Sequence, residues 1–395
     1  MSPPISFSPT SLGGMSIIDA FQKLSYAIFM EKNTRISAHG GEYEINKYGR
    51  DKISLDFSVN LNPLGIPESI KTVLDASSDY ASRYPSLDHN ELVELLAAKR
   101  GISKDWILMG NGASEIISLI VSAVTVNSDA KGSTALIIEP TFSGYERALK
   151  AHGVEITHLT LSEDIVGYIK KNPVSILFAC SPNNPTGRVI EPQLLKELAD
   201  TCKEQGTILV IDECFMGFVE SQDSADKSKY STASLIPDND HIVLIDAFTK
   251  LYAVPGIRLG YCISSNRKLL DKMAPLAPEW NISAIAEAAG IAVLSEDDYL
   301  REARELIANE KAFLTKELTN LGFTVFPGEA PFILVKLPDN TNSFSFYESM
   351  IKDQGILLRN CSNFHGLDES FYRIAIKKHD ENVKLVQACD AVLRR

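Results

Sequence analysis

Short apolar runs alternate with amphipathic segments through the middle of the chain. Segments with helical periodicity lie at 90–100, from 113 to about 124, at 142–152 and at 191–205. The apolar runs cover residues 135–139, 174–179, 208–212, 242–247 and 258–262. Continuous apolar strands that alternate with helices are typical of a buried, mostly parallel sheet with helices on both faces. The pattern predicts an α/β fold with a large three-layer αβα domain.

The pattern changes after about residue 275. A long helical segment is expected at 297–320, and shorter helices at 343–353 and 381–393. Short strands are expected at 323–326, 332–337, 356–359 and 372–376. This mixture predicts a smaller α+β domain. We expect an N-terminal extension over 1–37 that is partly disordered, an arm and part of the small domain over 38–75, a large domain over 76–295 and the small domain over 296–395.

The composition is that of an ordinary globular protein, with 45% hydrophobic and 23% charged residues among 395. The net charge of −12 argues against a nucleic-acid partner. No apolar run approaches the roughly 20 residues of a membrane helix, and no basic cluster opens the chain as in a secretory signal. The six cysteines are spread singly without a CxxC pair, so we expect buried thiols in the cytoplasm and no metal site.

Lys250 directly follows the apolar run 242–247, with Thr249 before it and Arg258 eight residues later. A lysine at a strand end in apolar surroundings is a candidate Schiff-base residue, because burial disfavours its ammonium form and frees a nucleophilic amine. The alternative is a surface lysine whose stem covers the sheet rim.

Two glycine-bearing turns follow strands and lead toward the same sheet edge. Residues 110–115 read Gly-Asn-Gly-Ala-Ser-Glu, and the backbone of Gly112 and Ala113 with the Ser114 hydroxyl could bind an anion at a helix N-terminus. Residues 181–187 read Ser-Pro-Asn-Asn-Pro-Thr-Gly, a rigid loop that could present the amide of Asn184. Each turn alone is equally compatible with a helix cap or a plain loop.

Two further side chains follow strands of the predicted sheet. Asp212 ends one strand, where a buried carboxylate needs a partner such as a protonated ring nitrogen, although a helix cap is an alternative. Phe142 follows another and offers an aromatic face for stacking, although core packing is the usual role of one phenylalanine. In open α/β sheets, ligands bind outside the carboxyl ends of the strands.

Together these residues describe a phosphorylated, planar aromatic aldehyde that contains a ring nitrogen. The turn at 112–114, Thr249 and Arg258 suit its phosphate, and Asp212 suits its ring nitrogen. Asn184 suits its ring oxygen, Phe142 its face and Lys250 its aldehyde. That cofactor is pyridoxal 5′-phosphate (PLP), which accepts electrons from a carbanion.

The motifs Ser-Pro-Asn-Asn-Pro-Thr-Gly, Asp212-Glu213, Thr249-Lys250 and Gly256-Ile-Arg258-Leu-Gly resemble those of fold-type I PLP enzymes of the class I/II aminotransferase group. The resemblance covers roughly residues 38–395. It implies a homodimer with shared active sites. It also implies that Tyr84, in Arg-Tyr-Pro, reaches the PLP phosphate of the partner subunit.

Two branches of this group compete. Histidinol-phosphate aminotransferases share the Asn-Pro-Leu-Gly and Gly-Asn-Gly segments. Threonine-phosphate decarboxylases of cobalamin biosynthesis further share His39-Gly-Gly, the segment 358–368 and Phe215 where aminotransferases usually carry tyrosine. The second resemblance is favoured and implies decarboxylation of L-threonine O-3-phosphate or L-serine phosphate.

The resemblance also implies which residues bind the substrate. Arg373 is expected to bind the substrate carboxylate, while Arg359 and His39 hold its phosphate, with Asn62 or Asn184 nearby. A surface ion pair is the alternative for Arg359, and a flexible entry loop is the alternative for His39. One methyl group separates the two phosphorylated amino acids, so the residues alone do not choose between them.

Overall fold

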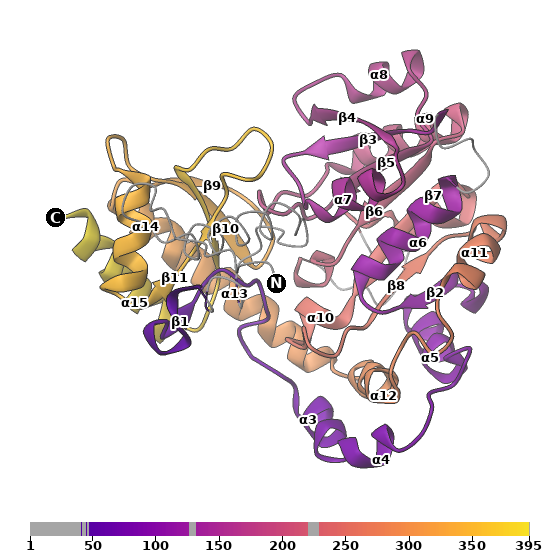
Figure 1. Ribbon diagram of the computed structural model, residues 1–395, viewed down its shortest axis with the longest axis horizontal. Coiled ribbons are helices and arrows are strands. Elements are labelled where there is room, and N and C mark those ends of the chain that lie inside the picture. The colour runs from indigo at the N-terminus through magenta and orange to yellow at the C-terminus, as the bar shows by residue number, and fades with distance from the viewer. Residues whose placement is uncertain (1–40, 42–44, 46, 126–131, 220–228, 395) are drawn as a thin grey trace, which may run out of the picture. The chain divides into compact units, whose positions relative to one another are not determined.

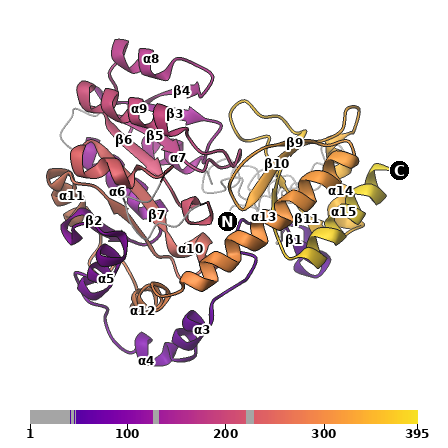
Figure 2. The ribbon, with the colours of Figure 1, turned by 180° about the vertical axis from the view of Figure 1, so that it is seen from behind.

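The computed structural model describes residues 41, 45, 47–125, 132–219 and 229–394. The expected N-terminal extension over 1–37 and the candidate substrate residue His39 lie outside these ranges. The described residues belong to one compact unit. It contains two main sheets, which occupy separate regions of Figure 1 and, from behind, of Figure 2.

The larger sheet has seven strands within the described residues, in the order β2-β8-β7-β6-β5-β3-β4. Its strands are β2 (Ile107–Gly110), β3 (Thr134–Glu139), β4 (Glu155–Thr160), β5 (Ile176–Cys180), β6 (Ile208–Asp212), β7 (Ile242–Ala247) and β8 (Gly260–Ile263). Neighbours pair in parallel except at β8, which is antiparallel to β7 and β2. The mostly parallel sheet is confirmed. The carboxyl ends of β2, β3, β5, β6 and β7 therefore lie along one edge.

Alternating residues of the buried strands pack into two different cores, as the twofold period of a strand requires. In β6, Leu209 and Ile211 join one core and Val210 joins the other. The first core is covered by α3 (Glu68–Asp75), α5 (Asn90–Arg100), α8 (Ile165–Lys171), α9 (Pro192–Gln205) and α12 (Ala284–Val293). The second is covered by α6 (Ala113–Thr125), α7 (Gly144–Ala151) and α11 (Arg267–Met273). The αβα layering follows from these two cores.

The smaller sheet has the strand order β12-β13-β10-β9 within the described residues. Its strands are β9 (Thr324–Phe326), β10 (Phe332–Lys336), β12 (Arg359–Asn360) and β13 (Phe371–Ala375). Helices α13 (Asp297–Asn320), α14 (Ser343–Lys352) and α15 (His379–Leu393) pack against it. Leu300 of α13 lies in a core of the large sheet and Ile307 in that of the small one, so α13 joins both regions (Figure 2).

The N-terminal arm divides between the two regions. Strand β1 (Leu55–Asp56) pairs in parallel with β11 (Ile356–Leu357), and Phe57 packs into the small core. Ile70 of α3 joins a core of the large sheet, and the short helix α4 (Ser77–Ala81) follows. The domain limits at residues 37, 75 and 295 stay predictions.

Two expected strands differ from the structure in ways that matter for the site. The strand expected at 258–262 begins at Gly260, because Arg258 has a left-handed backbone with φ of 61°. The strand expected at 356–359 is split into β11 and β12. β11 pairs with β1, whereas β12 pairs with β13, so the chain changes sheets at Leu358. This change places Arg359 in the small sheet.

Candidate active site

Lys250 lies on the short helix α10 (Phe248–Leu251), directly after β7. Burial, together with the positive charges of Arg373 and Arg258, lowers the pKa of its amine to about 8. At this pKa roughly a tenth of the amine is neutral at pH 7, compared with well under a thousandth for an ordinary lysine, and the neutral amine is nucleophilic. A lowered pKa is what we expect for a buried lysine at the end of a strand.

The backbone that carries Lys250 is held by Asn62. The Asn62 backbone N–H donates to the Lys250 carbonyl at 3.1 Å, and its Nδ2 donates to the Leu251 carbonyl at 2.9 Å. Its Oδ1 accepts from the Leu64 N–H at 3.0 Å. Asn62 thus positions the α10 backbone, and the substrate contact suggested for it stays a prediction.

The turn between β2 and α6 forms a narrow cradle beside Arg258. Gly112 has φ of +73°, and a Cβ there would lie 2.6 Å from Arg258 Nη2. A Cβ on Gly260 would lie 2.8 Å from the Ala113 N. Glycine at these two positions therefore lets Arg258 and β8 approach the turn closely. The first N–H groups of α6, at Ala113 and Ser114, have no intrahelical acceptor and could bind an anion beside this guanidinium.

Glu115, which the sequence analysis did not assign a role, closes the same turn. Its Oε2 accepts from the Asn111 N–H at 2.7 Å and from Asn281 Nδ2 at 2.7 Å. Asn111 Nδ2 in turn donates to the Asn281 carbonyl at 3.0 Å. The Gly-Asn-Gly-Ala-Ser-Glu motif contained this residue, but its distant partner at position 281 left no local signal.

Asp212 ends β6 as a buried carboxylate with two fixed contacts. Its Oδ2 accepts from the Tyr145 hydroxyl at 2.6 Å, and its Oδ1 accepts from the Cys214 N–H at 3.1 Å. The Tyr145 ring stacks on Phe178 at 5.0 Å and meets Phe142 edge-on at 5.5 Å. Tyr145, to which no sequence motif assigned a role, orients the carboxylate and supports the Phe142 ring.

The neighbouring Glu213 faces a different set of partners. It accepts from Ser231 Oγ at 2.5 Å and from the N–H and Oγ1 of Thr232 at 2.6 and 2.8 Å. Burial raises the pKa of Glu213 to about 7, although these hydrogen bonds oppose the shift. Glu213 therefore anchors the chain around residue 231, whereas Asp212 contacts Tyr145 and Cys214.

Arg373, on β13 of the small sheet, contacts the loop that follows β5. Its Nη1 donates to Asn184 Oδ1 at 2.5 Å and its Nη2 to the Ser58 carbonyl at 2.6 Å. Its guanidinium lies 5.4 Å from the centre of the Phe332 ring. Its buried Nε has no hydrogen-bond partner among the described residues. Burial, together with the positive charge of Arg359, lowers the pKa of Arg373 to about 10.

Four further residues were expected at the site: Thr249, Phe142, Arg359 and Tyr84. Thr249 is buried beside Lys250, and Phe142 is half-buried at the same sheet edge. Arg359 pairs across the strands with Arg373 and donates from Nη2 to Asn363 Oδ1 at 2.6 Å. Tyr84 is 77% exposed, with its ring 4.7 Å from that of Trp280.

PLP fits this arrangement on three observations. Glycine at position 112 lets the Arg258 guanidinium lie against the turn whose free N–H groups suit a phosphate. Asp212 presents a buried carboxylate, and Lys250 presents an amine with a lowered pKa. The unpartnered Nε of Arg373 leaves a buried cation ready for a further acceptor. The first groups suit a phosphorylated pyridine aldehyde, and the Arg373 cation suits a substrate with a negative charge.

A family model described as aminotransferase class I and II matches residues 52–391. The chain belongs to this family. Class I and II aminotransferases and their decarboxylase relatives depend on PLP, and so does this enzyme. The fold-type I architecture expected from the sequence is confirmed.

Three relatives place the chain within the family. The threonine-phosphate decarboxylase of Salmonella typhimurium is 34% identical, over 90% of this chain and 97% of that protein. The adenosylcobalamin biosynthesis bifunctional protein CobDQ of Leptospira interrogans is 32% identical, over 89% of this chain and 40% of that protein. The crystal structure of histidinol-phosphate aminotransferase from Clostridium acetobutylicum is 33% identical, covers 86% of this chain and 99% of that one, and has a TM-score of 0.77.

Proposed function

We propose that the enzyme removes CO2 from a phosphorylated amino acid for the nucleotide loop of a cobamide. The substrate is L-threonine O-3-phosphate or L-serine phosphate, and the product is aminopropanol phosphate or ethanolamine phosphate. The observation that carries the proposal is the pair Arg359 and Arg373, because such a substrate has two anionic groups to be bound. The 34% identity to a threonine-phosphate decarboxylase supports the same reaction.

In this proposal the large sheet holds the cofactor. The turn at Gly112, Ala113 and Ser114 binds its phosphate together with Thr249 and Arg258. Asp212 pairs with its ring nitrogen, Asn184 with its ring oxygen and Phe142 with its face. When bound, PLP supplies an aldehyde that captures amines and a conjugated ring that accepts electrons from the α-carbon.

The substrate is held from the small sheet. Arg373 binds its carboxylate, and Arg359 and His39 bind its phosphate, with Asn62 nearby. Asp212 keeps a negative charge against the ring nitrogen, which favours the electron-rich transition state. After CO2 leaves, Lys250 Nζ returns a proton to the α-carbon as a general acid.

An aminotransferase resembling that for histidinol phosphate is the second candidate. The 33% identity to the Clostridium acetobutylicum enzyme favours it, and two arginines would also suit a dicarboxylate amino-group acceptor. An aminotransferase removes the α-proton and keeps the carboxylate. The two reactions therefore differ in their products, CO2 or glutamate.

The deciding experiment assays the purified holoenzyme with L-threonine O-3-phosphate, L-serine phosphate, and histidinol phosphate plus 2-oxoglutarate. Release of CO2 from either phosphoamino acid, without glutamate from the third mixture, supports the decarboxylase. Glutamate without CO2 would establish the aminotransferase. The ratio of kcat/KM for the two phosphoamino acids shows which substrate is preferred.

We also propose a homodimer in the cytoplasm. Tyr84 and the neighbouring Trp280 are exposed aromatic side chains, which suits a tyrosine that reaches the PLP phosphate of a partner subunit. All six cysteines are free thiols, as in proteins of a reducing compartment. Among the described residues, no helix is both long and apolar enough to span a membrane.

A further inference from the structure

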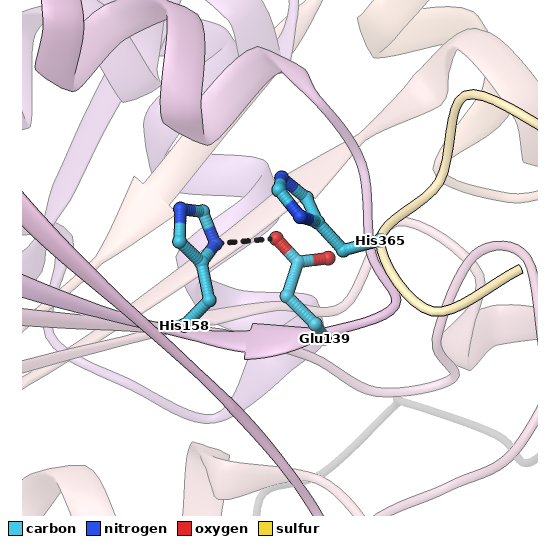
Figure 3. Close-up of side chains that lie close together, drawn as sticks. All are labelled: Glu139, His158 and His365. Carbon is cyan, nitrogen blue, oxygen red and sulfur yellow. Dashed lines mark hydrogen bonds and ion pairs between the residues drawn. The ribbon is translucent and has the colours of Figure 1, made fainter.

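Three side chains with metal-binding atoms meet where the large sheet faces a loop of the small domain. Glu139 ends β3, His158 lies on β4, and His365 lies on the loop between β12 and β13 (Figure 3). One ligand atom from each lies within 4.8 Å of the others. Glu139 Oε1 is 3.0 Å from His158 Nδ1, and the two imidazole rings stack with centroids 4.3 Å apart. The three residues form one compact cluster, which we call the Glu-His-His cluster.

A fourth residue, Glu146 of α7, lies close to both rings. Its Oε1 is 3.8 Å from Nε2 of His158 and 3.8 Å from Nε2 of His365. A carboxylate on the outer nitrogen of a metal-bound imidazole fixes its tautomer and leaves the inner nitrogen for the metal.

Glu139 is also held in place from behind. Its carboxylate is buried, and its Oε2 accepts from the Thr141 N–H at 2.7 Å. The other oxygen, Oε1, is the one that faces His158. One oxygen of a fixed carboxylate thus points at two imidazoles, an arrangement with the ligand types that zinc prefers.

We propose that the Glu-His-His cluster binds a divalent transition-metal ion such as Zn²⁺. Glu139, His158 and His365 are the ligands, Glu146 orients the imidazoles, and water completes a tetrahedral set. Ligand atoms bound to one zinc ion lie about 3.3 Å apart, given bond lengths of roughly 2.0–2.1 Å. The ligand atoms lie within 4.8 Å of one another, so small side-chain rotations bring them to this spacing. The sequence offered no signal, because the ligands are too far apart in the chain to form a spaced motif.

A bound metal ion would order the loop between β12 and β13, which contacts Arg359. His365 follows Asn363 by two residues, and Asn363 Oδ1 accepts from Arg359 Nη2 at 2.6 Å. The Arg359 guanidinium also lies 5.2 Å from the centre of the Phe364 ring, next to His365. An ion that fixes His365 to β3 and β4 therefore orders the loop that orients Arg359. This consequence for substrate binding rests on the proposed function, whereas the metal site does not.

Metal binding is measured directly on the holoenzyme. The protein is freed of trace metal with a chelator, and Zn²⁺ binding is followed by isothermal titration calorimetry. We expect one Zn²⁺ per chain at this site, with affinity reduced at least 100-fold in His158→Ala and in His365→Ala. The matched control is His379→Ala, because His379 is an exposed histidine paired with one carboxylate, Glu310, at 3.0 Å. The control must bind Zn²⁺ as the parent does.

Co²⁺ provides a readout that a merely structural role would not change. Co²⁺ in a tetrahedral nitrogen and oxygen site is expected to give a visible absorption band in the parent and the control, absent from His365→Gln. Retained near-ultraviolet circular dichroism shows that the variants are folded. Equal Zn²⁺ affinity in the parent and His365→Ala, or an unchanged Co²⁺ band in His365→Gln, overturns the proposal. Neither measurement needs turnover, so failure of the proposed function leaves the result interpretable.

Discussion

Arg359 and Arg373 lie directly opposite each other on the antiparallel strands β12 and β13. Residues in this position share one face of a sheet, so two positive side chains project from the same side. The charge of Arg359 contributes to the lowered pKa of Arg373. Like charges opposite each other destabilise a strand pair, and a bound dianion would offset that repulsion.

Replacing each of these arginines by lysine tests their roles. Arg373→Lys keeps the charge but loses the planar fork, and we expect kcat/KM to fall about 100-fold, corresponding to about 2.7 kcal/mol. Arg359→Lys should act mainly on KM and by about tenfold, because its guanidinium is less buried. Steady-state CO2 release measures both. Arg301→Lys, on the exposed surface of α13, is the control, and equal rates in all three variants would refute both roles.

Lys250 should impose a pH dependence on cofactor capture. Its pKa is lowered to about 8, so the amine is mostly protonated and unreactive below that pH and mostly neutral above it. The rate constant for Schiff-base formation with added PLP should rise about tenfold per pH unit below about 8 and level off above it. Stopped-flow absorbance follows this reaction. Lys250→Ala should form no band, whereas Lys311→Met, which removes another lysine with a pKa near 8, should keep the parent profile.

Asp212→Asn tests the ring-nitrogen contact. The amide keeps the shape of the side chain but not its negative charge, so PLP affinity should fall and kcat should drop about 1,000-fold. Tyr145→Phe removes only the 2.6 Å hydrogen bond to Asp212 and should cost about tenfold. Fluorescence titration gives PLP affinity, and CO2 release gives kcat. A normal rate in Asp212→Asn would exclude this role.

A matched pair of variants separates two effects of alanine at Gly112, the contact with Arg258 and the backbone strain. Gly101 and Gly112 both have left-handed backbones, with φ of +66° and +73°, so alanine strains each by about 1 kcal/mol. Only at Gly112 does the new Cβ meet Arg258, at 2.6 Å from Nη2, whereas nothing lies within 4 Å at Gly101. Both variants should lose similar thermal stability, but only Gly112→Ala should bind PLP about tenfold more weakly. Equal PLP affinity in both would remove Arg258 from the phosphate site.

Long, uninterrupted patterns allowed several elements to be predicted to the residue. The helices at 90–100 and 297–320 and the strands at 208–212 and 242–247 have the bounds expected from the sequence. β4 was missed because its residues Glu-Ile-Thr-His-Leu-Thr are mostly half-buried and mix polar with apolar side chains. α12 was missed because its many small apolar residues give no amphipathic period.

In the candidate site, too, residues within local motifs could be predicted, whereas contacts between distant parts of the chain could not. Lys250, Asp212 and Asn184 follow strands within short motifs, so the sequence places them at one sheet edge. The contact between Tyr145 and Asp212 spans 67 residues, and that between Arg373 and the Ser58 carbonyl spans 315. The first contact depends on how α7 packs on the large sheet and the second on how the N-terminal arm meets the small sheet, and no local pattern encodes either.

Mixing two inactive variants tests whether Tyr84 serves a partner's site. Tyr84 is 77% exposed, and in a twofold dimer each site would combine Lys250 of one chain with Tyr84 of the other. Random pairing of Tyr84→Ala with Lys250→Ala chains makes half of the dimers hybrid, each with one intact site, so about a quarter of the parental activity should return. Differently tagged, co-expressed chains allow the hybrid to be purified and assayed. If Tyr84 acted within its own chain, every site with an intact lysine would lack the tyrosine, and the hybrid would be no more active than Tyr84→Ala alone.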